Sequence, residues 1–312
     1  PPLEIVACGR DVEFRPLNLR GEMLCRMLYA VLKDHPHWET CGLAGSVLQG
    51  RLKPLPKLFS EEERSKQPSV FSILRALIEE FRNESDNRLA LIGAFGYDLL
   101  FQFDPIRLRL PRGRQKDLHL FFCDEIYLMD RKKEQIERYQ YDFDYEGLST
   151  LGLARDAAPV PPAPVLPPAE VTSDHTPAEY MEKVEKVREG MRRGDYYEVV
   201  LRQTFQVPYS GKPSDLFERV QHASPSPYEF FLQFGDEQLI GASPEMFVRV
   251  EGRRVETCPI SGTARRTGDP IRDANSIREL LNSTKEESEL TMCTDVDRND
   301  KSRVCVPGSV RV

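Results

Sequence analysis

The sequence has little that would take the protein into a membrane or onto a nucleic acid. Its 312 residues contain no apolar run close to the ~20 residues that a membrane-spanning helix needs. They also contain no long stripe of lysine and arginine, and the formal net charge is −7. Because nucleic-acid binding depends on a concentrated positive surface, we expect no membrane and no nucleic acid among the partners of this chain.

Disulfide frameworks and zinc sites are also missing as sequence patterns. The seven cysteines are scattered, odd in number and never spaced as Cys-x-x-Cys, and the five histidines are equally dispersed. A structural disulfide or zinc site would be expected to show paired or closely spaced cysteines and histidines. We therefore expect reduced thiols in a cytoplasmic protein, and histidines with structural or surface positions.

A proline-rich stretch divides the sequence. Six prolines lie between Pro159 and Pro168. Since proline lacks a backbone donor and favours an extended conformation, this stretch is predicted to be a linker. We assign residues 1–156 to an N-terminal region, 157–172 to the linker and 173–312 to a C-terminal region.

The pattern of apolar residues predicts a mixed fold on both sides of the linker. In the N-terminal region, helices are expected at 21–32 and 71–81, and strands at 89–97 and 118–129. In the C-terminal region, Thr176 and Glu179 form a capping-box pattern that predicts a helix ending at Gly194. The segments that follow are predicted to be a strand at 196–208, a short helix at 216–220, and antiparallel hairpins at 228–242 and 246–257. These elements predict an α+β protein with antiparallel β-sheets and flanking helices.

Two segments of the C-terminal region could carry chemistry. In PISGTARR (259–266), Gly262 would let backbone N–H groups approach a ligand, and the Thr263 hydroxyl could donate to a carboxylate. A surface turn with solvated arginines is the more common meaning of such a segment. The second segment lies in a helix expected to start near Asp273, where Glu286 and Glu289 project from one face.

Two like charges on one helical face are unfavourable unless a cation lies between them. Magnesium takes carboxylate oxygens and completes its octahedron with water. A solvated acidic face is the commoner explanation of a Glu-x-x-Glu spacing. For the charged block that follows, 295–303, we favour an ion-pair network that fixes the end of the helix.

The order of several blocks is more specific than any one of them. These blocks are GDYYEVVLRQTF (194–205), SPSPYEFF (224–231), GASPE (241–245), PISGT (259–263) and KEESELTMCTDVDRND (285–300). In this order they resemble the chorismate-utilising enzymes, and most closely the large component of anthranilate synthase. The resemblance covers the whole C-terminal region, and it extends loosely into the N-terminal region at 91–100.

The resemblance implies a reaction and a set of site residues. Similar enzymes that make aminodeoxychorismate typically carry lysine where this chain has Ser261, and isochorismate or salicylate synthases typically carry a lysine base where it has Glu198. With neither lysine present, the expected reaction converts chorismate and ammonia to anthranilate and pyruvate, in tryptophan biosynthesis. The implied site residues are Gly262 and Thr263 as substrate-binding residues, with Thr263 also catalytic, and Glu286 and Glu289 as ligands of a Mg²⁺ cofactor.

The resemblance also implies partners and regulation. Ammonia would come from glutamine through an amidotransferase subunit or fused domain. Tryptophan would act as a feedback inhibitor at the positions of Pro227, Tyr228 and Glu229, although the family more often has methionine at the last of these. Two alternatives stay open, namely an aminodeoxyisochorismate synthase of the same fold and a non-catalytic tryptophan-binding or regulatory remnant.

The sequence also reads as cut at both ends. It begins with two prolines, and residues 309–312 have the pattern of a strand. The resemblance implies further site elements that do not occur in the sequence up to Val312. They are a histidine block, an arginine and a tyrosine for the enolpyruvyl carboxylate, and a second pair of glutamates. We therefore expect a chorismate-utilising fold that is incomplete at its C-terminus, with 173–312 as the first part of the catalytic domain, and no activity from this chain alone.

Overall fold

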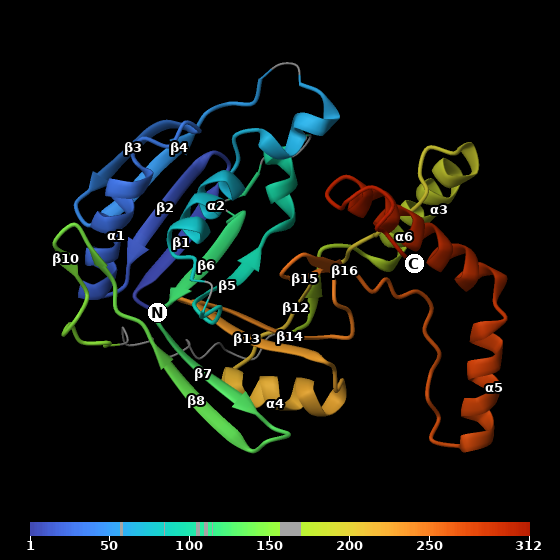
Figure 1. Cartoon of the computed structure of the whole chain (residues 1–312). Helices are drawn as coiled ribbons and strands as arrows, with labels where there is room; N and C mark the ends of the chain where they lie inside the picture. Colours follow the sequence, from blue (N-terminus) through green and yellow to red (C-terminus); the bar gives the residue numbers. More distant parts are fainter. Residues whose placement is uncertain (57–58, 84, 104–106, 109–111, 114, 157–169) are drawn as a thin grey trace. The chain divides into compact units, whose positions relative to one another are not determined.

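A computed structural model describes residues 1–56, 59–83, 85–103, 107–108, 112–113, 115–156 and 170–312 (Figure 1). The chain forms two compact units, Pro1–Pro159 and Val160–Val312, and each is described by itself. The predicted linker at 157–172 falls mostly on residues outside the described ranges, so the domain assignments stay predictions. No helix in the described ranges is long and apolar enough to cross a membrane.

The first unit is built on a six-stranded antiparallel sheet with the strand order β3-β4-β2-β1-β6-β5. Its strands are β1 (Leu3–Cys8), β2 (Asp11–Pro16), β3 (Trp38–Ala44), β4 (Val47–Leu52), β5 (Ala90–Phe95) and β6 (Leu118–Cys123). Strand β1 is central and pairs with β2 on one side and β6 on the other. Three residues of β1 that are fully buried, Leu3, Ile5 and Ala7, alternate along the strand as expected for one face turned to the core.

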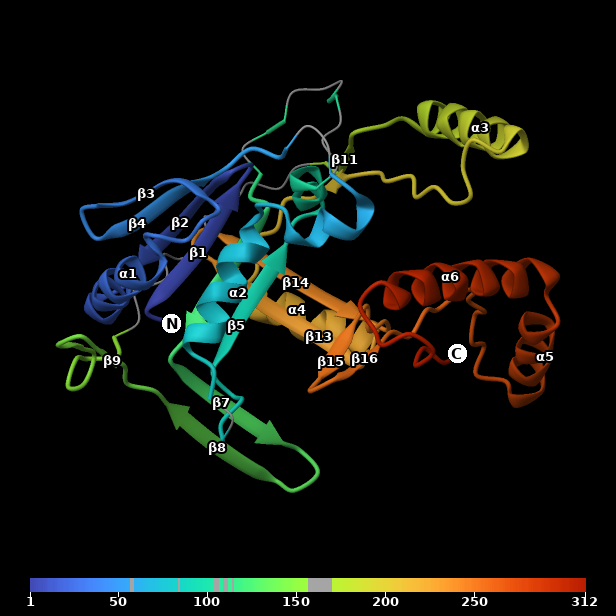
Figure 2. The ribbon, with the colours of Figure 1, turned by 45° about the horizontal axis from the view of Figure 1, so that its top comes forward.

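Two helices cover one face of this sheet, as Figure 2 shows from a second direction. They are α1 (Leu19–Leu32) and α2 (Val70–Glu80), which confirm the helices predicted at 21–32 and 71–81. Asn18 caps α1 by accepting a hydrogen bond from the Gly21 amide. Two short 3₁₀ helices complete this part of the unit, η1 (Glu61–Lys66) and η2 (Tyr97–Gln102).

The predicted strand 118–129 is in fact two strands that separate at Asp124. After β6, the chain enters β7 (Glu125–Asp130), which pairs with β8 (Gln135–Gln140) in a hairpin of its own. A two-residue pairing of β9 (Asp144–Tyr145) with β10 (Leu148–Ser149) follows. The two strands separate at Asp124 because its buried carboxylate accepts hydrogen bonds from two arginines, Arg20 and Arg155.

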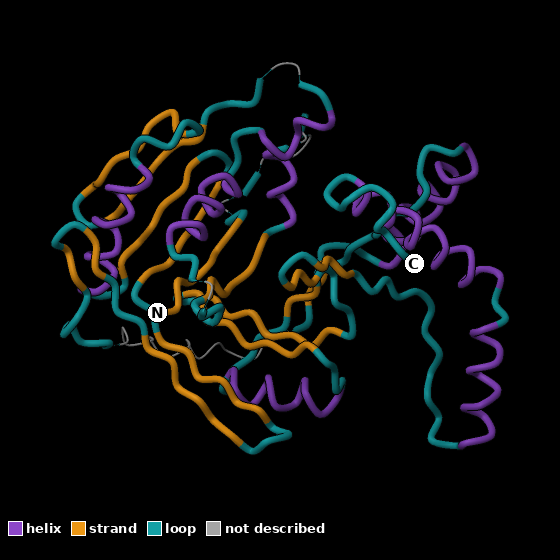
Figure 3. Tube along the Cα trace, viewed as in Figure 1, coloured by secondary structure: helices purple, strands orange, loops and turns teal. Residues whose placement is uncertain are grey.

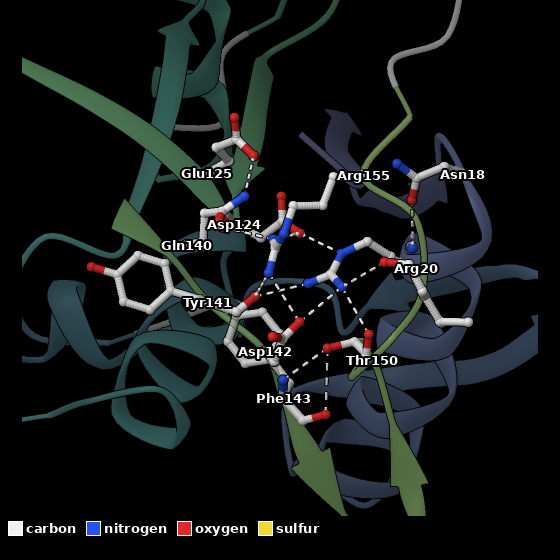
Figure 4. Close-up of polar contacts among 12 residues, drawn as sticks. Asn18, Arg20, Asp124, Glu125, Gln140, Tyr141, Asp142, Phe143, Thr150 and Arg155 are labelled. Carbon is white, nitrogen blue, oxygen red and sulfur yellow. Dashed lines mark hydrogen bonds and ion pairs between the residues drawn. The ribbon is translucent and has the colours of Figure 1, made fainter. Parts of the chain in front are cut away.

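These arginines form a buried polar network (Figure 4). Arg20 of α1 is 1% exposed, and it donates to Asp124 at 2.6 Å and to Asp142 at 2.9 Å. Arg155 donates to the same two carboxylates, at 2.7 and 2.9 Å, and to the Tyr141 carbonyl at 2.8 Å. A buried charge is tolerated only when it is paired and hydrogen-bonded. The network therefore fastens α1 to the start of β7 and to the chain that follows β8.

The second unit begins with the predicted capped helix. Helix α3 (Pro177–Arg193) has Thr176 and Glu179 in a reciprocal capping box, and Gly194 ends it in the left-handed conformation with φ of +79°. Helix α4 (Pro213–Ala223) extends the predicted helix at 216–220 in both directions. It packs against the hairpin of β13 (Tyr228–Phe234) and β14 (Glu237–Ser243), which confirms the predicted hairpin.

Other predictions in the second unit are wrong in part. Of the expected strand at 196–208, only β12 (Phe205–Gln206) forms, paired with β11 (Thr172–Ser173). The second hairpin is shorter than expected and pairs β15 (Arg249–Glu251) with β16 (Arg254–Glu256). Residues 309–312 have no regular structure.

The last predicted helix is two helices. They are α5 (Pro270–Leu281) and α6 (Thr284–Ser302), which pack together, and a break at Asn282 and Ser283 separates them (Figure 3). The charged block at 295–303 lies largely inside α6, where Asp295 and Arg298 form an exposed ion pair and not a buried network. The elements of both units are those of an α+β protein with antiparallel sheets and flanking helices, as predicted.

Candidate functional site

The predicted substrate-binding bend is held against the start of α6. Residues 259–263 form no helix or strand, and Gly262 has φ of +66°, in the left-handed region that favours glycine. Ser261 fixes the bend, because its hydroxyl donates to the backbone carbonyl of Glu286 at 3.1 Å. Two blocks that lie about 25 residues apart in the sequence are thus brought together by a hydrogen bond.

Glycine at position 262 is also required by space. A Cβ atom placed on Gly262 would lie 2.5 Å from Oε2 of Glu286, 2.9 Å from its Cδ and 3.0 Å from Cδ1 of Leu280. Real Cβ atoms do not approach other atoms this closely, so any side chain here would push the Glu286 carboxylate away. The structure therefore brings two of the predicted site residues, Gly262 and Glu286, into direct contact.

The two predicted metal ligands are joined by a lysine. Lys285 Nζ donates to Oε1 of Glu286 at 3.0 Å and to Oε2 of Glu289 at 2.7 Å. These hydrogen bonds, first that to Glu289 and then that to Glu286, raise the pKa of Lys285. Both carboxylates lie in the first two turns of α6, which Ser283 caps by accepting from the Glu286 amide. A cation therefore does lie between Glu286 and Glu289, and it is the ammonium of Lys285.

The two carboxylates would suit a magnesium ion whose other ligands are water and substrate oxygens. Oε2 of Glu286 is buried and has no hydrogen-bond partner, so one strong acceptor beside Gly262 is unused. No group of three or more histidine, cysteine, aspartate or glutamate side chains in the described ranges is arranged to hold a metal. Mg²⁺ commonly takes only one or two protein carboxylates and fills its other positions with water and substrate oxygens. Glu286 and Glu289 are the residues that would hold it.

Further acidic side chains gather on the same side of α6. The pKa of Cys293, one turn after Glu289, is raised first by loss of solvent and then by negative charge from Glu198, Glu289 and Asp297. Glu198 is the position at which the resemblance implies a lysine base in isochorismate and salicylate synthases. Glu198 and Glu289 therefore both contribute negative charge at the Cys293 thiol.

The other predicted residues lie differently. Thr263 is exposed, next to Gly262. Of the predicted tryptophan site, Pro227 and Tyr228 are exposed, and the carboxylate of Glu229 accepts from Gln221 of α4 at 2.7 Å. Glu229 therefore ties α4 to the start of β13, and its assignment to tryptophan binding stays a prediction.

Sequence reasoning missed the part played by Lys285. It treated the pair of glutamates as needing an external cation, although Lys285 lies four residues before Glu289, a spacing that favours an ion pair. It also missed the break before α6. The pattern Ser283-x-x-Glu286 is a capping-box sequence and would have placed the start of the helix correctly.

Comparison with known families connects this site to an enzyme family. Residues 43–312 match the model of the chorismate binding enzyme family. This range includes the bend at 259–263 and both glutamates. The chain belongs to the chorismate binding enzymes. The match confirms the resemblance that the order of the sequence blocks predicted.

Individual relatives agree with this assignment. An anthranilate synthase of Azospirillum brasilense is 45% identical over 323 aligned residues, covering 100% of this chain and 43% of that protein. Aminodeoxychorismate synthase component 1 of Salmonella typhimurium is 34% identical, covering 71% of this chain and 48% of that protein. The crystal structure of anthranilate synthase component I from Streptococcus pneumoniae matches with a TM-score of 0.57 and 29% identity, covering 71% of this chain and 52% of that one.

Two consequences follow from these coverages. The likeness to the solved structure confirms the predicted α+β fold of the family. The chain spans about half the length of the relatives that it matches.

Proposed function

We propose that this chain supplies part of the active site of an anthranilate synthase, which converts chorismate and ammonia to anthranilate, pyruvate and water. The observation that carries the proposal is the contact between Gly262 and the Glu286 carboxylate. Glu289 is joined to Glu286 through the ammonium of Lys285. The identity of 45% to an anthranilate synthase, over the whole of this chain and 43% of that protein, supports the same reaction.

The residues of this chain would bind and orient the substrate. Chorismate is a dicarboxylate, and the exposed Thr263 hydroxyl is available to donate to it, while the left-handed Gly262 has no side chain that would push the Glu286 carboxylate away. Ser261 keeps the bend at a fixed distance from α6 through its hydrogen bond to Glu286. Binding the substrate at this bend would set its ring beside the two glutamates, and such fixed placement is a large part of catalysis.

The glutamates would hold Mg²⁺, directly or through water. When bound, Mg²⁺ would neutralise the ring carboxylate of chorismate and so favour loss of the ring hydroxyl. Ser261 supports ammonia as the attacking group, because the resemblance implies a nucleophilic lysine at this position in aminodeoxychorismate synthases, and the serine hydroxyl here is engaged with the Glu286 carbonyl. Ammonia from glutamine, delivered by an amidotransferase subunit or fused domain, and feedback inhibition by tryptophan belong to the same proposal.

One relative favours a second candidate. Because this chain matches an aminodeoxychorismate synthase component at 34% identity, a reaction that stops before pyruvate is lost is the second candidate. An aminodeoxyisochorismate synthase would stop at the same stage. Ser261 argues against the first of these, because the resemblance implies a lysine there in aminodeoxychorismate synthases. Fluorescence separates anthranilate synthase from both alternatives, since only anthranilate is aromatic and fluorescent.

The test uses the protein at its full natural length, with chorismate, ammonium and Mg²⁺, and follows anthranilate fluorescence. Wild type should form anthranilate, and Glu286→Gln should lower kcat/KM by about 100-fold or more, because a metal-binding carboxylate is lost. Glu287→Gln is the matched control, since this neighbour is exposed on the same turn of α6. Equal activity of wild type and Glu286→Gln would refute the proposal, and accumulation of a non-fluorescent aminated product would favour the second candidate. A protein that binds tryptophan but consumes no chorismate would be the non-catalytic remnant.

A further inference from the structure

Lys285 has a position that the family assignment does not explain. Its ammonium bridges Glu286 and Glu289, which are the two side chains that would bind the metal. The lysine side chain is 71% exposed, whereas those of Glu286 and Glu289 are 21% and 37% exposed. The lysine therefore reaches in from solvent to a pair of less exposed carboxylates.

Lys285 and a metal ion would compete for the same two carboxylates. Oε1 of Glu286 and Oε2 of Glu289 each accept a hydrogen bond from Nζ, at 3.0 and 2.7 Å. A divalent cation shared by the two carboxylates, on these oxygens or on the free Oε2 of Glu286, would bring two positive charges beside the ammonium and repel it. The long, exposed stem of lysine can turn to water without disturbing α6.

We propose that Lys285 is an internal stand-in for the magnesium ion. Its ammonium holds Glu286 and Glu289 together in the metal-free protein, and it is displaced when Mg²⁺ binds. This proposal rests on the proposed function of the two glutamates as metal ligands. In the metal-free protein, the lysine offsets the repulsion between carboxylates three residues apart on one helical face.

The stand-in makes Mg²⁺ binding weaker than the carboxylates alone would allow. Exposed ion pairs are individually weak, so the loss of two of them should change the dissociation constant modestly. We expect Lys285→Met to bind Mg²⁺ about fivefold more tightly than wild type. Methionine keeps the length of the apolar stem and removes only the charge. Lys285→Arg keeps the charge and should stay within about twofold of wild type.

The experiment measures Mg²⁺ affinity by isothermal titration calorimetry, on the protein at its full natural length and at low salt. Lys186→Met is the matched control, because Lys186 of α3 also pairs with a glutamate, Glu182, and is equally exposed, at 69%. The control should bind Mg²⁺ like wild type, which separates a local exchange from a general change in net charge. The gain of Lys285→Met over wild type should shrink as salt screens the ion pairs.

The outcomes are distinct. The stand-in is supported if Lys285→Met binds Mg²⁺ more tightly than wild type and Lys186→Met does not. Unchanged or weaker binding by Lys285→Met overturns it, while the metal site survives if Glu286→Gln still abolishes binding. If wild type binds no Mg²⁺ and Glu286→Gln makes anthranilate normally, the stand-in and the proposed function fail together.

Discussion

Replacing Gly262 by alanine tests the contact on which the site depends. The new Cβ would lie 2.5 Å from Oε2 of Glu286, whereas ordinary contacts begin at 3.4 Å. The carboxylate must therefore retreat by the difference, about 0.9 Å. A displacement of about 1 Å in an active site is enough to lower catalysis about 100-fold. We expect a loss of this size in kcat/KM for Gly262→Ala, together with weaker Mg²⁺ binding.

A control separates this effect from backbone strain. Gly252 also has a positive φ, +59°, but a Cβ there would have no neighbour within 4 Å. Alanine at either position would destabilise the fold by about 1 kcal/mol through its left-handed conformation. Anthranilate fluorescence, Mg²⁺ calorimetry and urea unfolding, all on the protein at its full natural length, compare the two variants. Full activity and full Mg²⁺ affinity in Gly262→Ala would refute the reasoning.

Two further predictions concern the stability of the first unit, which the fluorescence of Trp38, the one tryptophan of the sequence, reports directly. Arg20→Met should lower the free energy of unfolding by about 3 kcal/mol, because it leaves buried Asp124 with fewer partners. The control Arg51→Met, at an exposed ion pair, should change this free energy by less than about 1 kcal/mol. Equal effects of the two variants would contradict the role of the buried network. Burial raises the pKa of the Cys25 thiol from 9.0 to about 11. The folded state therefore holds the proton more tightly, and its stability should be complete below pH 9 and fall by about 2 kcal/mol by pH 10.5. Cys25→Ala should lack this fall, and an unchanged pH profile in wild type would show that the thiol is not buried as described.

The sequence predicted best those elements whose signals are local. Thr176 and Glu179 form the predicted capping box, and Gly194 ends the helix, because caps depend on residues only three or four positions apart. The hairpin that turns at Gly235 was equally readable, since its two strands are neighbours in the sequence.

Predictions that depend on distant partners were weaker. The apolar run at 196–208 looked like a strand, but only Phe205 and Gln206 pair with another strand in the described ranges, and Val200 is 86% exposed. A strand needs a partner, and a periodic pattern does not say whether one is present. The strand at 118–129 was interrupted for a related reason, because Asp124 meets arginines that are far away in sequence.

The candidate site combined both kinds of information. The resemblance named Gly262 and Glu286, and their roles stay predictions, but only the structure shows that the two residues touch. The bridge made by Lys285 was readable only in part, because its spacing of four residues indicates the ion pair with Glu289, whereas the adjacent Glu286 is not expected to face it on a helix.

The most direct test of the account is the location of the metal. A crystal structure of the protein at its full natural length, with Mn²⁺ in place of Mg²⁺ and a chorismate analogue, would reveal the ion by its anomalous scattering. The account predicts one strong peak within about 2 to 5 Å of the carboxylates of both Glu286 and Glu289, bound directly or through one water, with Lys285 turned away and the analogue against Gly262. A peak held by other residues, with Lys285 still bridging the two glutamates, would contradict it.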